Sequence, residues 1–287
     1  MIGAAASFTV MAGAAKMTPS IPTMEKIFAR SLISVLLTLW ALRGVGAAAR
    51  PKKPWRMVLR ASLGFVALFC YFESIARMPL GTAVTVYNTA PLWAGLVGLF
   101  FLGEAFGGRQ LISMLIGLAG VALIGGLSVD VTWAGVGFGL ACSILSASAY
   151  TTVRLMNRDG EHPMMIVLCF PLVSLPLSAG AALLPGGGGF ILPQGWDWWW
   201  LLVLGLGTQG GQVCLTYALS SLTAARATQI GYVGVIFAMA LGSAMGDGLP
   251  GWIQWAGAGL IFASLIAFRP RAAPATIAAS ATSVKDR

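Results

Sequence analysis

Charged residues are scarce in this sequence. Of its 287 residues, 18 are Lys or Arg and 9 are Asp or Glu, so only 9% carry a charge. Soluble globular proteins are charged at about a quarter of their positions. This shortage argues against a soluble fold, a disordered chain and a coiled coil.

Histidine and cysteine are rare as well. The one histidine is His162, and the four cysteines stand singly inside apolar runs, with no Cys-x-x-Cys pair. Zinc sites, disulfide frameworks and redox motifs need closer spacing. Asp159 and Glu161 flank the loop beside His162 without metal-ligand spacing, and we expect them in solvent. The sequence predicts no metal and no cofactor, which makes a membrane-embedded enzyme a distant alternative.

Motifs for nucleotides and nucleic acids are also missing. No GxxxxGK[ST] loop is present, so no nucleotide-binding subunit is implied. The net charge of +9 comes from basic residues that are spread between apolar runs and form no patch. This distribution argues against a nucleic-acid partner.

Apolar residues, in contrast, make up 57% of the chain, and the mean hydropathy is +0.84. A membrane-spanning helix needs about 20 predominantly apolar residues. Segments that contain Gly, Pro or charged residues separate ten such stretches: 1–16, 28–46, 57–77, 80–102, 110–128, 133–154, 163–184, 197–219, 224–246 and 251–268. The predicted fold is therefore all-α, a polytopic integral membrane protein with about ten transmembrane helices. Residues 270–287 are rich in Ala, Ser and Thr and are expected to form a disordered cytoplasmic tail.

The distribution of basic residues sets the expected orientation. With the N-terminus inside and ten spans, the cytoplasmic side receives 14 basic residues: Arg43, Arg50, Lys52, Lys53, Arg56, Arg60, Arg109, Arg154, Arg158, Arg226, Arg269, Arg271, Lys285 and Arg287. The other side receives four: Lys16, Lys26, Arg30 and Arg77. Because basic residues concentrate on the cytoplasmic side, both termini are predicted to be cytoplasmic.

Two segments of the chain share a pattern. Residues 74–104 and 218–247 each contain the end of one helix, a short turn, a long apolar helix and a closing Gly-acid pair. They occupy the third–fourth and eighth–ninth spans, which indicates a five-helix unit used twice, at 1–128 and 129–269. An odd-numbered unit reverses its orientation when repeated, and inverted repeats are typical of secondary transporters.

Short motifs also connect the chain with a known family. The span 80–102 has MPLGTA at its start, Pro91-Leu92 in its middle and Leu102-Gly103-Glu104 at its end, with further matches at 28–30, 120–124 and 150–154. In this order the sequence resembles two EamA domains of the drug/metabolite transporter superfamily over residues 1–269. The resemblance implies transport of a small metabolite, often export of amino acids or related compounds, across a bacterial inner membrane. The second unit departs from the pattern, with no mid-helix proline and Asp247 in place of Glu.

Polar residues inside the spans are the candidates for a substrate site. Pro91 cannot donate a hydrogen bond to the carbonyl of Tyr87, and a freed carbonyl at that depth needs protein or a wet cavity around it. Comparable polar faces occur in the sixth, eighth and ninth spans, where Gly234 is the helix-weakening residue. We predict a substrate-binding cavity lined by Tyr87, Asn88, Pro91, Tyr150, Gln209, Gln212, Gln229 and Tyr232. Helix packing is the alternative role for each of these side chains.

The expected substrate follows from these hydroxyl and amide groups. They suit a neutral or zwitterionic, amino-acid-like metabolite that is exported by alternating access, whereas a multivalent anion would want Arg or Lys at midplane. Arg30 lies near a span end, where its side chain can reach the interface instead of binding a carboxylate.

Other roles remain open at this stage. Glu73 is a weak candidate for ion coupling, and an ion pair with Arg77 is the alternative. A lipid-carrier flippase or a channel on the same scaffold is the alternative function.

Overall fold

The fold is entirely helical over the part of the chain that the computed structural model describes, which is residues 1–43, 52–77, 80–104, 106–125, 132–184, 189–245 and 249–267. The helices are α1 Ile2–Lys16, α2 Thr23–Leu42, α3 Pro54–Arg77, α4 Leu80–Tyr87, α5 Ala90–Leu102, α6 Gly108–Gly125, α7 Trp133–Arg158, α8 Pro163–Leu183, α9 Asp197–Ser221, α10 Ala224–Ile230, α11 Val233–Ala244 and α12 Trp252–Ala267. This confirms the all-α prediction and its ten spans. The predicted disordered tail 270–287 and the acidic residue Asp247 lie outside the described residues.

Local signals set several helix ends. The hydroxyl oxygens of Thr132 and Thr223 accept hydrogen bonds from backbone N–H groups at the starts of α7 and α10. Such caps satisfy amide groups that have no partner within the helix. Gly103 ends α5 in the left-handed conformation, with φ of 62°, which glycine adopts at little cost.

Two of the ten spans are broken in the middle. The fourth span is interrupted at Asn88 and Thr89 between α4 and α5, and the ninth is interrupted at Gly231 and Tyr232 between α10 and α11. Pro91 lies in the first turn of α5 and accounts for the first break. In the ninth span the break falls at Gly231, and Gly234, which we expected to weaken this helix, lies inside α11.

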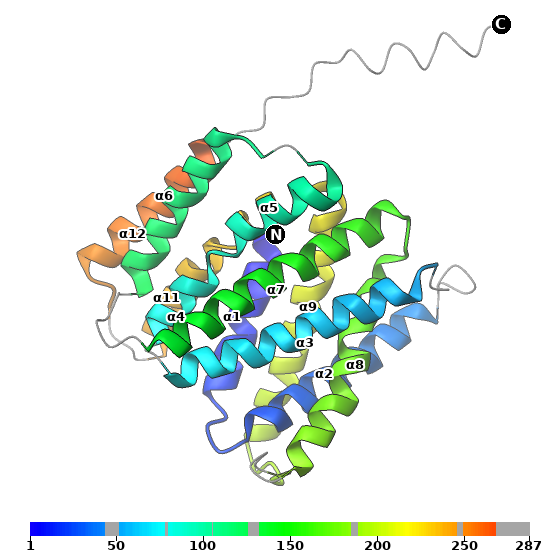
Figure 1. Cartoon of the computed structure of the whole chain (residues 1–287). Helices are drawn as coiled ribbons and strands as arrows, with labels where there is room; N and C mark the ends of the chain where they lie inside the picture. Colours follow the sequence, from blue (N-terminus) through cyan, green and yellow to red (C-terminus); the bar gives the residue numbers. More distant parts are fainter. Residues whose placement is uncertain are drawn as a thin grey trace, which may run out of the picture.

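The helices are arranged in pairs across the bundle (Figure 1). The pair α6 and α12 forms one side, the pair α2 and α8 forms the opposite side, and the broken spans lie with α1, α3, α7 and α9 between them. The contacts are reciprocal: α3 packs on α7 as α9 packs on α1, and α2 on α9 as α8 on α3. This is the pattern expected when the sixth to tenth spans repeat the arrangement of the first five spans.

Glycine brings the α6–α12 pair into close contact. A Cβ atom added at Gly120 would lie 2.5 Å from the carbonyl oxygen of Gly257, and one added at Gly257 would lie 2.6 Å from that of Gly120. Gly207 and Gly211 of α9 make similar room for α1, because a Cβ there would overlap the backbone of Met11 and the ring of Phe8. Small residues allow this close packing where lipid provides no hydrophobic driving force.

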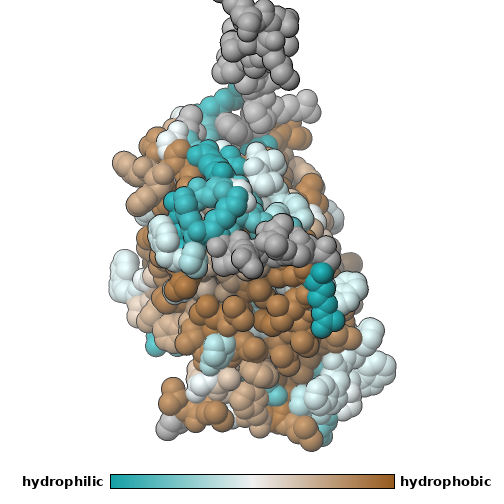
Figure 2. Space-filling model, turned by 90° about the vertical axis from the view of Figure 1, so that its right-hand side faces the viewer, coloured by the Kyte–Doolittle hydropathy of each residue, from teal (hydrophilic) through white to brown (hydrophobic). Residues whose placement is uncertain are grey.

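The surface fits a bilayer. Five segments are long and apolar enough to cross one: Ala83–Leu102, Gly108–Gly125, Trp133–Arg158, Pro163–Leu183 and Ala224–Ala244. Figure 2 shows hydrophilic residues gathered toward one end of the visible face, with a broad hydrophobic area below them.

The two ends of the bundle differ in composition. Exposed tryptophans such as Trp133, Trp196 and Trp252, which are 91%, 78% and 80% exposed, stand where α7, α9 and α12 begin. We call this the tryptophan end, since such residues favour the membrane interface. The opposite end, where α3 begins and α7 ends, we call the charged end.

Candidate substrate cavity

A cavity of about 570 Å³ lies in the middle of the bundle. Every helix except α6 and α12 contributes to its wall, and both broken spans do so close to their breaks, at Asn88 and at Gly231. The volume is within the range of sites for small organic ligands. The cavity therefore lies where inverted-repeat transporters place their substrates.

Aromatic side chains from three helices form one wall. The hydroxyl groups of Tyr87 on α4 and Tyr150 on α7 are 3.4 Å apart, and either can donate. The ring of Tyr71 on α3 meets Tyr87 edge to face, with their centroids 5.6 Å apart. All three tyrosines line the cavity, and such rings can contact an apolar substrate body while the hydroxyl groups stay available for hydrogen bonding.

The break between α4 and α5 is fixed to α7. The Thr89 hydroxyl donates to the carbonyl of Val86 at 2.7 Å and lies 2.8 Å from the Ser143 hydroxyl, while Trp93 Nε1 donates to Thr89 at 3.3 Å. Asn88 Nδ2 donates to the Val84 carbonyl at 2.8 Å. These bonds hold Asn88 and Pro91 at the cavity wall, as the sequence predicted for their position.

Gln229 and Tyr232 do not line the cavity, which corrects the sequence-based prediction for both. Both are fully buried on the opposite side of α10 and its break, against α6 and α12. Gln229 Nε2 donates to the Ser113 hydroxyl at 2.8 Å, and Gln229 Oε1 accepts from Arg226 at 3.0 Å. Tyr232 packs with Val121 and Ile261. Their polar groups join helices.

The two glutamines of α9 have different surroundings. Gln212 lines the cavity together with Leu215. Gln209 lies just outside this wall, in a group that also includes Arg30 and Phe170. It donates to the Thr38 hydroxyl of α2 at 2.9 Å, which corrects its predicted place in the lining. Of the eight predicted residues, Tyr87, Asn88, Pro91, Tyr150 and Gln212 are thus brought together, and a binding role for them stays a prediction.

Glu73 also lies outside the cavity wall. It forms an ion pair with Arg77 four residues along α3, near the tryptophan end, and Arg77 stacks over the ring of Phe138 at 5.0 Å. This position does not support the ion-coupling hypothesis, which remains untested.

Two arginines that the sequence analysis placed outside the cavity do line it. These are Arg30 of α2 and Arg60 of α3, and the guanidinium carbons of both lie over the ring of Phe170 on α8. Sequence analysis assigned Arg30 to a span end and counted Arg60 with the cytoplasmic charges. The available signal was that each stands well inside its helix, since Arg30 follows Thr23 and Arg60 follows Pro54 by nearly two turns.

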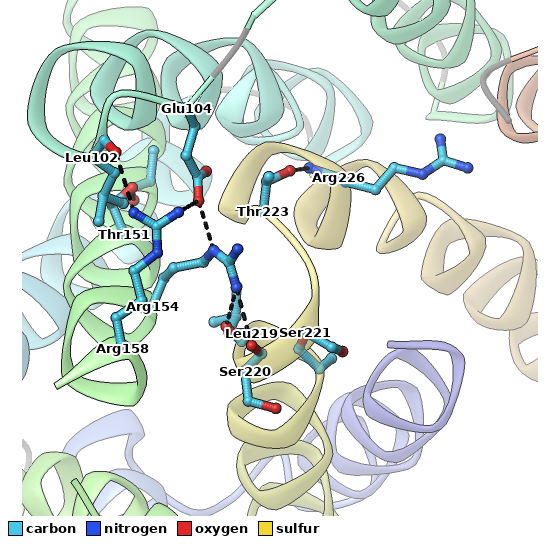
Figure 3. A network of polar contacts seen from close by, with 12 residues as sticks. Leu102, Glu104, Thr151, Arg154, Arg158, Leu219, Ser220, Ser221, Thr223 and Arg226 are labelled. Carbon is cyan, nitrogen blue, oxygen red and sulfur yellow. Dashed lines mark hydrogen bonds and ion pairs between the residues drawn. The ribbon is translucent and has the colours of Figure 1, made fainter. Parts of the chain in front are cut away.

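A network of polar contacts joins helices at the charged end of the bundle (Figure 3). Glu104, after α5, accepts hydrogen bonds from Arg154 Nε at 2.7 Å and from Arg158 Nη2 at 2.9 Å. Arg154 also donates to the carbonyls of Leu219 and Ser220 at the end of α9, at 3.0 and 3.2 Å. The Glu104 carboxylate therefore joins α5 to α7, and the Arg154 guanidinium joins α7 to α9.

The α7–α8 loop adds a second set of contacts at the same end. Glu161 is 3% exposed and accepts from the backbone N–H groups of Lys52 and Lys53 at 3.1 and 2.7 Å. Asp159 forms ion pairs with Lys53 and Arg56. The expectation that this acidic pair lies in solvent was therefore wrong, because the chain before α3 folds back over the loop.

Within the described ranges, the two broken spans pack against each other at the charged end. The helix α10 packs against α5 at the charged end, whereas the reciprocal pair, α4 and α11, has no comparable contact among the described residues. The cavity wall extends to Ala12 and Ala238 on the other side. The two broken spans therefore close against each other at the charged end.

This combination defines a class of protein: a polytopic membrane bundle of inverted repeats with a central cavity that is closed at one end. Comparison with known families agrees with it. The EamA-like transporter family matches twice, over residues 1–126 and 133–269. The chain belongs to the EamA-like transporter family.

Several characterised and uncharacterised proteins are similar along most of the chain. The pseudopaline exporter of Pseudomonas aeruginosa is 28% identical over 273 residues, which covers 91% of each chain. The riboflavin transporter of Rhizobium johnstonii is 27% identical and covers 86% of this chain and 82% of its own. A crystal structure with a TM-score of 0.77 and 20% identity covers 93% of this chain and 94% of that chain, and supports the fold. The protein is therefore a membrane transporter.

Proposed function

We propose that this protein exports a small organic metabolite across the bacterial inner membrane by alternating access, with both termini in the cytoplasm. The observation that carries the proposal is the central cavity of about 570 Å³ between the two repeats. The excess of basic residues toward the charged end supports a cytoplasmic position for it. The relatives named above include an exporter, which supports the direction.

The one-sided closure of the bundle supports the mechanism. With the charged end in the cytoplasm, the structure is a state closed to the cytoplasm by α5, α10 and the Glu104 network. In an inverted repeat, the opposite state exchanges the two halves' conformations, so that α4 would meet α11 while α5 and α10 separate. Each break provides a place where half of a span can move without the other half.

Counterflow in proteoliposomes tests the proposal. A panel of labelled small metabolites is offered to vesicles preloaded with the same unlabelled compound, and a substrate should accumulate transiently with saturable kinetics. Val84→Trp, at the cavity wall, should abolish this counterflow by filling the site. Val66→Trp is the matched control because Val66 is 46% exposed on α3 and faces away from the cavity.

The same assay separates the alternatives. A channel would pass the solute without saturation or counterflow, and a flippase would move lipid-linked compounds only. Export itself is tested in cells, which should hold less of the identified substrate when they overproduce the parent protein than when they produce Val84→Trp. Equal counterflow by Val84→Trp and the parent would contradict the cavity as the substrate site.

A further inference from the structure

The cavity contains two guanidinium groups that share one aromatic ring. Arg30 and Arg60 both line it, and their Cζ atoms lie 5.5 and 5.3 Å from the centre of the Phe170 ring. Gly64, one turn after Arg60, makes this arrangement possible, because a Cβ atom there would come within 2.5 Å of Arg60 Nη1 and 2.9 Å of the ring. The missing side chain at Gly64 therefore leaves the space in which the Arg60 guanidinium and the Phe170 ring pack at the cavity wall.

Neither arginine has an acidic partner among the described residues. The Nε atoms of both are buried without a hydrogen-bond partner, and the hydrogen bond of Arg30 is a weak one to the Met11 sulfur at 3.7 Å. Each acidic side chain in the described ranges has a different hydrogen-bond or ion-pair partner. The pairs are Glu25 with Ile191, Glu73 with Arg77, Glu104 with Arg154 and Arg158, Asp159 with Lys53 and Arg56, Glu161 with Lys52 and Lys53, and Asp197 with Gln194.

A buried guanidinium without a counter-ion is costly in this environment. Arginine stays protonated in proteins, and Arg60 is only 4% exposed. A cation within a membrane span is therefore found facing a partner or a cavity and marks a functional site by default. The Phe170 ring compensates only in part, since a cation–π contact offsets a fraction of the cost of removing a guanidinium from water.

We propose that Arg30 and Arg60 bind the carboxylate groups of an anionic metabolite, which is the substrate class of this transporter. The inference rests on the proposed function and replaces the neutral or zwitterionic, amino-acid-like substrate that the sequence predicted. A carboxylate satisfies the planar fork of a guanidinium with two hydrogen bonds. Tyr71, Tyr87 and Tyr150 contact the remaining body of the substrate, and an ammonium group finds no carboxylate on the cavity wall among the described residues.

The charge of the cavity can be measured without knowing the substrate. Leu68 lines the cavity two turns after Arg60 on α3. Leu68→Cys, in a background without the four native cysteines, is treated with an anionic and with a cationic methanethiosulfonate reagent, and each rate is divided by the rate for a free thiol. The anionic reagent should react faster by about fivefold to twentyfold, as expected for two charges at roughly 10 Å in a wet cavity.

Charge-neutral variants identify the source of this preference. Arg30→Gln and Arg60→Gln should each reduce the ratio, and the double variant should bring it close to one. Arg43→Gln is the matched control, since Arg43 follows α2 at the charged end and is exposed. An equal rate for both reagents, or a preference that survives in the double variant, would overturn the proposal.

Protection of the same cysteine tests the ligand chemistry. Succinate should slow the labelling at a lower concentration than succinamide, which has the same shape without charge, and the difference should vanish in the double variant. Equal protection by the two compounds, protection by neither, or equal protection by inorganic phosphate would refute carboxylate binding. If neither reagent reaches Leu68→Cys at all, the cavity is not accessible, and it is the proposed function that fails.

Discussion

Removing the charge of Glu104 should open the charged end of the bundle. Its carboxylate is 8% exposed and accepts hydrogen bonds from Arg154 and Arg158, of which the Arg154 side chain is 12% exposed and the Arg158 side chain 43%. The Arg158 contact is screened by solvent and contributes little. A hydrogen bond between charged groups contributes about 1.5–3 kcal/mol, so Glu104→Gln should shift the equilibrium between the closed and open states by about tenfold to hundredfold.

The accessibility of a buried residue beneath this network measures the shift. Ala225, which is 4% exposed at the start of α10, is replaced by cysteine in a background without native cysteines. In everted vesicles, a membrane-impermeant thiol reagent should label Ala225→Cys faster by that factor when Glu104→Gln is added. Glu73→Gln is the matched control, because its ion pair with Arg77 lies at the other end. Unchanged labelling in a monodisperse Glu104→Gln protein would refute the role of this network in closure.

Three further outcomes follow from the packing and the charge distribution. Gly120→Val should lower the melting temperature in detergent and the free energy of unfolding by about 1–3 kcal/mol or more, because its Cβ would lie 2.5 Å from a carbonyl oxygen of α12. Gly137→Val is the control and should not lower the melting temperature, since nothing lies within 4 Å of a Cβ there. Asn88→Ala should weaken apparent substrate affinity by about 2- to 13-fold. Gln229→Ala should leave affinity unchanged and lower the free energy of unfolding by about 1–3 kcal/mol. The opposite pattern in binding and unfolding measurements would contradict these positions. A reporter active only in the cytoplasm should be active when fused after residue 287, and a periplasmic reporter should be active near residue 187; a periplasmic C-terminus would contradict the orientation.

The sequence by itself determined the membrane-spanning organisation. Scarce charge and long apolar stretches are properties of composition and order, and a bilayer leaves helices as the structure that satisfies the backbone of each stretch. Pro91 also marked the break in the fourth span, because a proline lacks the N–H group that a continuous helix needs. The repeat and the family resemblance were also readable along the chain.

Only the tertiary structure decided which polar faces meet the cavity. Helical spacing predicts that Thr228, Gln229 and Tyr232 lie close together on their span, but not which neighbour that face contacts. The α6–α12 pair covers Gln229 and Tyr232, so their polar groups bond to protein, while Thr228 lines the cavity. Arg30 and Arg60 stand on different helices, and their convergence on Phe170 follows from the packing of α2, α3 and α8. That packing depends on contacts between residues distant in sequence, which no local pattern records.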